Sequence, residues 1–157
     1  VERPDTFQDT IHVVYWDQKW IEHIFPCTTH AGLYYLQNPQ RRSGCAILKH
    51  DYQYRSSFTI GMRSSGYKCL VPCKDIPVWR DSNLDDVIDY GGRDFDSAGI
   101  QIHRANANDN SVKIGRYSAG CVVIQTGFHN FMALCEKQVL NNLGNKFTLT
   151  ILEGMHL

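Results

Sequence analysis

Apolar residues occur along the first eighty positions in short runs, which polar or turn-forming residues interrupt about every ten positions. Residues 11–16 read Ile-His-Val-Val-Tyr-Trp, and a similar run at 20–25 follows the polar residues 17–19. Short runs rich in β-branched and aromatic residues are typical of the strands of a sandwich or barrel. Runs of the same kind predict further strands at 32–36, 45–48, 57–60, 67–71 and 76–79.

The second half of the chain begins with an acidic stretch, residues 81–97, in which we expect a loop. Two apolar runs after it predict strands at 99–103 and 121–125, and a last run predicts a strand at 147–152. No repeat, low-complexity tract or Pro/Gly-rich linker divides the chain. We therefore expect residues 1–157 to form a single domain.

One segment has the periodicity of a helix. Its apolar residues recur three or four positions apart, which is the spacing of one helix face; they are Phe128, Phe131, Met132, Cys135, Val139 and Leu143. Thr126 is the expected N-cap, and Gly144 is the expected stop. The whole pattern predicts a mainly β fold, with a sandwich or barrel-like sheet and one amphipathic helix near the C-terminus.

Charge and composition narrow the class of protein. The chain has 16 Lys and Arg against 16 Asp and Glu, so its formal net charge is zero, which argues against a nucleic-acid binder. A hydrophobic fraction of 43% excludes a disordered chain, and no apolar run is long enough to span a membrane. Six cysteines are too few for a disulfide scaffold of this length, but at least one is a candidate for chemistry.

Two residues at the ends of predicted strands have the chemistry of a nucleophile and its base. His103 ends one strand, and Cys121 begins another eighteen positions later. A cysteine nucleophile needs an imidazole to accept its proton, so neighbouring strands would bring the pair within hydrogen-bond reach. Gly120 opens the backbone to a substrate carbonyl, and the amides of Gly120 and Cys121 are expected to form an oxyanion hole. A thiolate–imidazolium pair would titrate below the ordinary cysteine pKa of about 8.5.

The residues around this pair resemble the active-site signature of the L,D-transpeptidase catalytic domain family. That signature is a His followed, after a similar interval, by Ser or Thr, His, Gly, Cys, a hydrophobic residue and Arg or Asn. His103, Ser118, Gly120, Cys121 and Val122 match it, with fourteen residues between His103 and Ser118. The Ser-Ala-Gly-Cys variant most resembles relatives from bacteriophages and their gut-bacterial hosts. The β-rich first hundred residues and the late helix also suit the fold of that family.

Two positions depart from the signature. Ala119 stands where the family has its second His, and Val123 stands where it has Arg or Asn. The first departure removes a polar group beside the thiol, and the second removes a hydrogen-bond donor. We expect the acyl-transfer chemistry to survive, because nucleophile and base remain, and the choice of substrate to differ.

The resemblance implies a role for the matching residues. Cys121 is the nucleophile, His103 is the general base and later the acid, and the backbone carbonyl of Arg104 orients the His103 ring. The implied substrate is the peptide stem of bacterial peptidoglycan, whose acyl group passes to an amine or to water. The chemistry requires no cofactor, and the implied location is the cell envelope, the periplasm or a virion.

Two other functions stay open on the sequence. A phage-type or toxin-like lytic hydrolase that cleaves glycan would need a pair of carboxylates, for which Asp94 and Asp96 are candidates. A non-catalytic module of a cell wall or virion would instead keep the fold with a decayed site, marked by Ala119 and Val123.

Two groups of residues have the ligand types of a metal site. The first has oxygen ligands at positions 1, 3, 5 and 9 of a calcium-loop register, and its members are Asp81, Asn83, Asp85 and Asp89. It lacks the glycine and the closing acid of such a loop, because Asp86 and Gly92 occupy those positions. The second group offers zinc-type ligands without a diagnostic spacing and consists of Cys27, His30, Cys69 and Cys73. Cys69 and Cys73 are also the pair most easily bridged by a disulfide.

Overall fold

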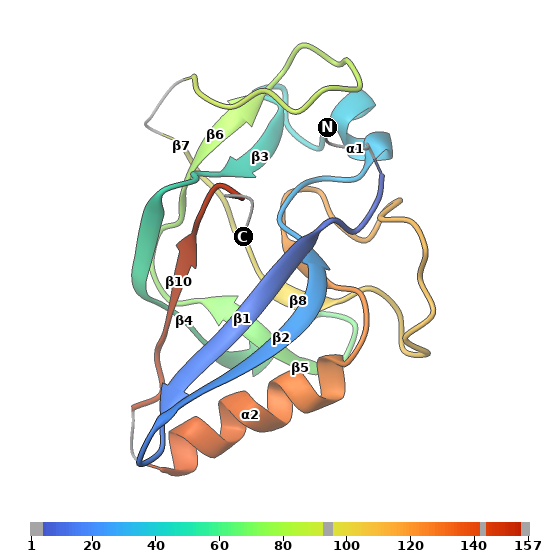
Figure 1. The fold of residues 1–157 in the computed structure, drawn as a ribbon. Helices are drawn as coiled ribbons and strands as arrows, with labels where there is room; N and C mark the ends of the chain where they lie inside the picture. The colour runs from blue at the N-terminus through green and yellow to red at the C-terminus, as the bar shows by residue number, and fades with distance from the viewer. Residues whose placement is uncertain (1–4, 93–95, 142–143, 155–157) are drawn as a thin grey trace.

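A computed structural model describes residues 5–92, 96–141 and 144–154, and confirms that the protein is mainly β (Figure 1). In chain order the elements are β1 Asp9–Trp16, β2 Trp20–Thr28, α1 Leu33–Gln37, β3 Cys45–Leu48, β4 Tyr52–Met62, β5 Lys68–Pro72, β6 Pro77–Asp81, β7 Asp96–Ser97, β8 Ile102–Arg104, β9 Val122–Ile124, α2 Phe128–Leu140 and β10 Phe147–Ile151. No helix in the described ranges is long and apolar enough to cross a membrane.

Seven strands form a curled sheet in the order β1-β2-β9-β8-β5-β4-β10. Its neighbouring strands are antiparallel except β8 and β9, which run parallel. The long β1–β2 hairpin crosses the molecule diagonally, and α2 lies alongside its lower half (Figure 1). The parallel pair lies in the middle of the sheet, so both strands have hydrogen-bonded neighbours on both sides.

The three strands β3, β6 and β7 form a second, smaller sheet. Tyr54 of β4 ties it to the large sheet, because the Tyr54 hydroxyl donates to the Pro77 carbonyl at 2.9 Å and accepts from the Lys49 amide at 2.8 Å. Burial raises the pKa of Tyr54 to about 12. The phenol therefore stays protonated and keeps its role as a donor at any ordinary pH.

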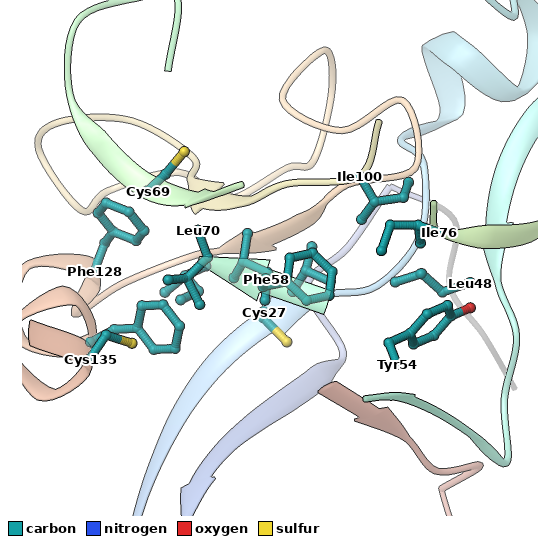
Figure 2. Packing of buried hydrophobic residues seen from close by; sticks show 14 of the residues in the cluster. Cys27, Leu48, Tyr54, Phe58, Cys69, Leu70, Ile76, Ile100, Phe128 and Cys135 are labelled. Carbon is teal, nitrogen blue, oxygen red and sulfur yellow. The ribbon is translucent and has the colours of Figure 1, made fainter. Parts of the chain in front are cut away.

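The larger of two hydrophobic clusters in the described residues fills the space between α2, the large sheet and the small sheet. Figure 2 shows it running from the helix toward the small sheet, through Cys135, Phe128, Leu70, Phe58, Ile100, Ile76, Leu48 and Tyr54. Phe58 and Ile76 are fully buried in it. The helix contributes Phe128, Phe131, Met132 and Cys135, which are four of the six residues of the predicted apolar face.

Three local predictions are wrong. Asp96–Ser97, at the end of the stretch expected to be a loop, forms the strand β7. Residues 32–36 were expected to form a strand, but Leu33–Gln37 is the short helix α1. The amides of Tyr35 and Leu36 both donate to the Gly32 carbonyl, and Leu36 alone of the helix is fully buried. The N-cap of α2 is Gly127, in a left-handed conformation, and not Thr126.

The end of α2 also differs from the prediction. The helix ends at Leu140 with Asn141 as its C-cap, so Gly144 does not follow it directly, and Leu143 lies outside the described residues.

Candidate active site

The parallel pairing of β8 and β9 brings His103 and Cys121 to one face of the sheet. Ile102 pairs with Val122, and both face the hydrophobic core. Since side chains alternate between the faces of a sheet, His103 and Cys121 project to the opposite face. The two strands are neighbours, which is the condition for bringing the thiol and the imidazole together.

His103 is buried, and its ring is held in one orientation. Its side chain is 2% exposed, and Nδ1 donates to the Arg104 carbonyl at 2.8 Å. This bond fixes the proton on Nδ1 and leaves Nε2 as an acceptor, and Nε2 has no hydrogen-bond partner. Burial lowers the pKa of His103 to about 4. At neutral pH the ring is therefore an uncharged base with a free lone pair.

Cys121 is a half-buried thiol beside the same strand. The Gln101 amide donates to its Sγ at 3.4 Å. Burial raises the pKa of the thiol, and the Gln101 amide and the Arg63 guanidinium oppose that rise. The expected thiolate–imidazolium pair is therefore wrong for the resting protein: both groups are neutral, and no hydrogen bond joins them.

The turn before Cys121 is built by Ser118 and Gly120. The buried Ser118 hydroxyl donates to the Cys121 carbonyl at 2.7 Å and accepts from the Gly120 amide at 3.1 Å. Gly120 has φ +125°, and a Cβ there would lie 2.5 Å from the Ala46 carbonyl oxygen. Because Ser118 already uses the Gly120 amide, only the Cys121 amide of the expected oxyanion pair is available in this conformation.

Arg63 and Gln101 are site residues that the sequence did not reveal. Arg63 Nη1 donates to Gln101 Oε1 at 2.5 Å, and the Gln101 backbone contacts the Cys121 sulfur. Arg63 begins the turn between β4 and β5, where its amide donates to the Tyr67 carbonyl at 2.9 Å. Its positive charge lowers the pKa of both His103 and Cys121. Nothing near Cys121 in the sequence signals this contact, because Arg63 comes from a turn 58 positions earlier in the chain.

Cys121 lines a cavity of about 150 Å³ between the two sheets. The cavity walls come from the loop before β3, from β6, from the segment before β8 and from the turn before β9; the lining residues are Gln40, Arg41, Gly44, Cys45, Ala46, Arg80, Ala98, Gly99, Ile100, Ala119 and Cys121. Ala119 therefore lies at the cavity wall, and the imidazole that the resemblance predicts at this position is replaced by a methyl group.

The predicted calcium ligands are occupied by hydrogen bonds within their own loop. Asn83 Nδ2 donates to the carboxylates of Asp85 and Asp89, at 3.0 and 2.6 Å. The buried Asp81 accepts from the Asp89 amide at 3.0 Å, and burial raises the pKa of its carboxyl group. Their carboxylates do not gather within 4.8 Å of one another, so calcium stays a prediction from the sequence.

Other candidate ligands are also separated. Among the described residues, only His50, Asp51 and Glu153 bring three ligand atoms of His, Cys, Asp or Glu within 4.8 Å of one another, and this group was not predicted. The predicted zinc set does not gather, and the six cysteines are all free, Cys69 and Cys73 included. Of the suggested carboxylate pair, Asp96 binds Arg80 Nε at 2.6 Å, and Asp94 lies outside the described residues.

No protein-family model matches the chain, and no curated protein or solved structure shows significant similarity to it.

Proposed function

We propose that the protein is a cysteine acyltransferase or hydrolase that acts on the peptide stems of peptidoglycan through an acyl-enzyme on Cys121. The observation that carries this proposal is the unpartnered, buried Nε2 of His103 on the strand next to Cys121. A buried polar atom without a partner costs free energy, so its retention favours a functional role. The match of His103, Ser118, Gly120 and Cys121 to the L,D-transpeptidase signature supports the same chemistry and fold.

The first half of the reaction uses His103 as a base. As Cys121 Sγ bonds to the carbonyl carbon of the stem peptide, its proton passes to His103 Nε2. The Cys121 amide donates to the oxyanion of the tetrahedral intermediate. When the carbon–nitrogen bond breaks, the leaving amine takes the proton from Nε2, and a thioester remains on Cys121.

The second half regenerates the thiol. Nε2 accepts a proton from an incoming amine or water, which attacks the thioester carbon. The sulfur leaves and takes the proton back from His103. Nδ1 keeps its proton throughout, because the Arg104 carbonyl at 2.8 Å holds it. In the resting protein the thiol and Nε2 are not hydrogen-bonded, and such contacts commonly tighten only when substrate binds.

The test is the loss of activity in single and double variants. Cys121→Ala and His103→Ala should each reduce peptidoglycan turnover by about 10²-fold or more, and the double variant should lose little beyond that, because both residues serve one step. Mass analysis of digested peptidoglycan measures the bond cleaved and the acceptor together.

The matched control is Cys73→Ala, because Cys73 is an exposed thiol that does not line the cavity. This variant should retain parental turnover. Each variant must keep the circular dichroism spectrum and melting temperature of the parent. Parental activity in a folded Cys121→Ala variant would disprove the cysteine mechanism and favour the glycan-cleaving alternative.

A further inference from the structure

The cavity beside Cys121 is lined by positively charged side chains. Two arginines from different elements line it, Arg80 from β6 and Arg41 from the loop between α1 and β3. The remaining lining residues include no Asp or Glu. A volume of about 150 Å³ is several times the volume of one water molecule, so a carboxylate group fits.

Arg80 is held rigidly at the cavity wall. Its side chain is only 11% exposed. Nε donates to Asp96 at 2.6 Å, Nη1 donates to the Gly44 carbonyl at 3.3 Å, and Nη2 donates to the Ser97 carbonyl at 3.0 Å. A guanidinium group carries five N–H donors, so two of them have no acceptor among the described residues. A planar, fixed guanidinium is the group best matched to a carboxylate.

Arg41 adds a second positive charge at the cavity wall. Its side chain is exposed and forms no ion pair in the described residues, while the Asp96 carboxylate is bound to Arg80. Both arginines lower the pKa of Asp96, which places Arg41 near the same carboxylate. Among the described residues, Arg41 and Arg80 are therefore the charged side chains that line the cavity beside Cys121, and no carboxylate lines it.

We infer that this cavity is an anion subsite, in which Arg41 and Arg80 hold a carboxylate of the molecule that reacts with Cys121. The subsite makes Arg41 and Arg80 specificity-determining residues for a substrate that carries a free carboxylate beside the reacting carbon. That the reacting carbon is the carbonyl of a stem peptide rests on the proposed function. The positive charge of the arginines that line the subsite is independent of the proposed function.

The test compares two alkylating reagents that differ only in this charge. Iodoacetate and iodoacetamide react with a thiolate by the same displacement, in which the sulfur–carbon bond forms as iodide leaves. The ratio of their rate constants cancels the thiolate fraction of each cysteine. Mass mapping of alkylated peptides gives the ratio for Cys121, with the exposed Cys73 as the internal reference.

We expect the iodoacetate-to-iodoacetamide ratio to be about tenfold higher at Cys121 than at Cys73, because a nearby cation attracts the carboxylate reagent. Arg41→Gln should lower the ratio at Cys121 severalfold. Arg42→Gln is the matched control. It removes the same charge from the next residue, whose side chain does not line the cavity. That variant should leave the ratio unchanged.

Three results would overturn the subsite. These are equal ratios at Cys121 and Cys73, an equal fall in the Arg41→Gln and Arg42→Gln variants, or failure of both reagents to reach Cys121 in the folded protein. In the last case a substrate carboxylate could not enter either.

A second measurement separates the subsite from the proposed function. Stem peptides with a terminal carboxylate are compared with their carboxamides, and Arg41→Gln should raise KM severalfold for the carboxylate alone. Cys121-dependent turnover that ignores this difference would refute the subsite and leave the acyltransferase proposal standing. A reagent ratio that depends on Arg41, without turnover of either peptide, would refute the acyltransferase proposal and leave the subsite standing.

Discussion

At the scale of single residues, burial sets the charge state of the candidate site. His103 and Cys121 are both taken out of water, which disfavours the imidazolium and the thiolate alike. Arg63 favours the thiolate and disfavours the imidazolium, because it is a fixed positive charge near both. The resting pair is therefore a neutral thiol and a neutral base. In the proposed mechanism, the proton therefore passes from Cys121 to His103 only when the thiol attacks the substrate.

This charge state predicts how stability depends on pH. Folded His103 stays neutral down to a pKa of about 4, whereas the unfolded chain binds a proton near pH 6.5. Between these values the unfolded state holds more protons, so stability rises with pH. The contribution of neutral His103 to the free energy of unfolding is complete above pH 6.5. It is lost as the pH falls toward 4, and the loss is at most about 3 kcal/mol.

Urea unfolding between pH 4 and 7 measures the effect. His103→Asn cannot titrate and should flatten the pH dependence of the unfolding free energy, whatever its own stability. His129→Asn, at an exposed position of α2, should keep the slope of the parent. Equal slopes in the parent and His103→Asn would show that His103 does not carry the dependence.

At the scale of elements, close contacts between backbone segments determine the conformation of short segments. The α1 helix has only five residues, too few to show a helical period in the sequence. Gly32 fixes its start. The Gly32 amide donates to the Ser118 carbonyl at 2.9 Å. Any larger residue would not fit, because a Cβ at this position would lie 2.1 Å from the Gly115 carbonyl oxygen. The same tight packing shapes the turn that carries Cys121.

Gly120→Ala should destabilise the protein more than Gly66→Ala. Both residues have positive φ, at +125° and +91°, which costs an L-residue about 1–2 kcal/mol. A Cβ at Gly66 meets nothing within 4 Å, whereas one at Gly120 would collide with the Ala46 backbone. The clash should add about 2 kcal/mol to the loss of unfolding free energy at Gly120.

Chemical denaturation of the two variants separates the strain of the φ angle from the clash. If both variants lose the same free energy of unfolding, the close approach of Ala46 does not constrain the turn.

At the scale of the whole molecule, the site lies where the two sheets meet. β8 and β9 belong to the large sheet, and Arg80 of the small sheet reaches the β3 end and β7 through three hydrogen bonds. Tyr54 and the shared core join the sheets elsewhere. The position of the cavity therefore depends on how the sheets are held together.

Arg80→Met should lower the melting temperature clearly, because it leaves the Gly44 and Ser97 carbonyls and the Asp96 carboxylate without their donor. Arg41→Gln should change the unfolding free energy by less than about 0.5 kcal/mol, as expected for an exposed side chain that forms no ion pair among the described residues. Thermal unfolding of both variants checks the contrast. An unchanged melting temperature in Arg80→Met would mean that Arg80 does not stabilise the small sheet.

The sequence by itself determined the features that depend on local pattern. Alternating and β-branched runs predicted most of the strands, and helical spacing predicted α2, because a long element repeats its pattern several times. Residue chemistry and the spacing of a motif indicated the candidate residues His103, Ser118, Gly120 and Cys121, because all four lie in one stretch of chain.

Only the tertiary structure decided the features that join distant segments. Arg63, Arg41 and Arg80 reach the surroundings of Cys121 from other strands and loops, and no local pattern records such a meeting. The same holds for the neutral state of His103 and for the Gly120 amide held by Ser118. Burial and hydrogen bonding are properties of the packed chain, so charge and donor availability follow from packing and not from residue type alone.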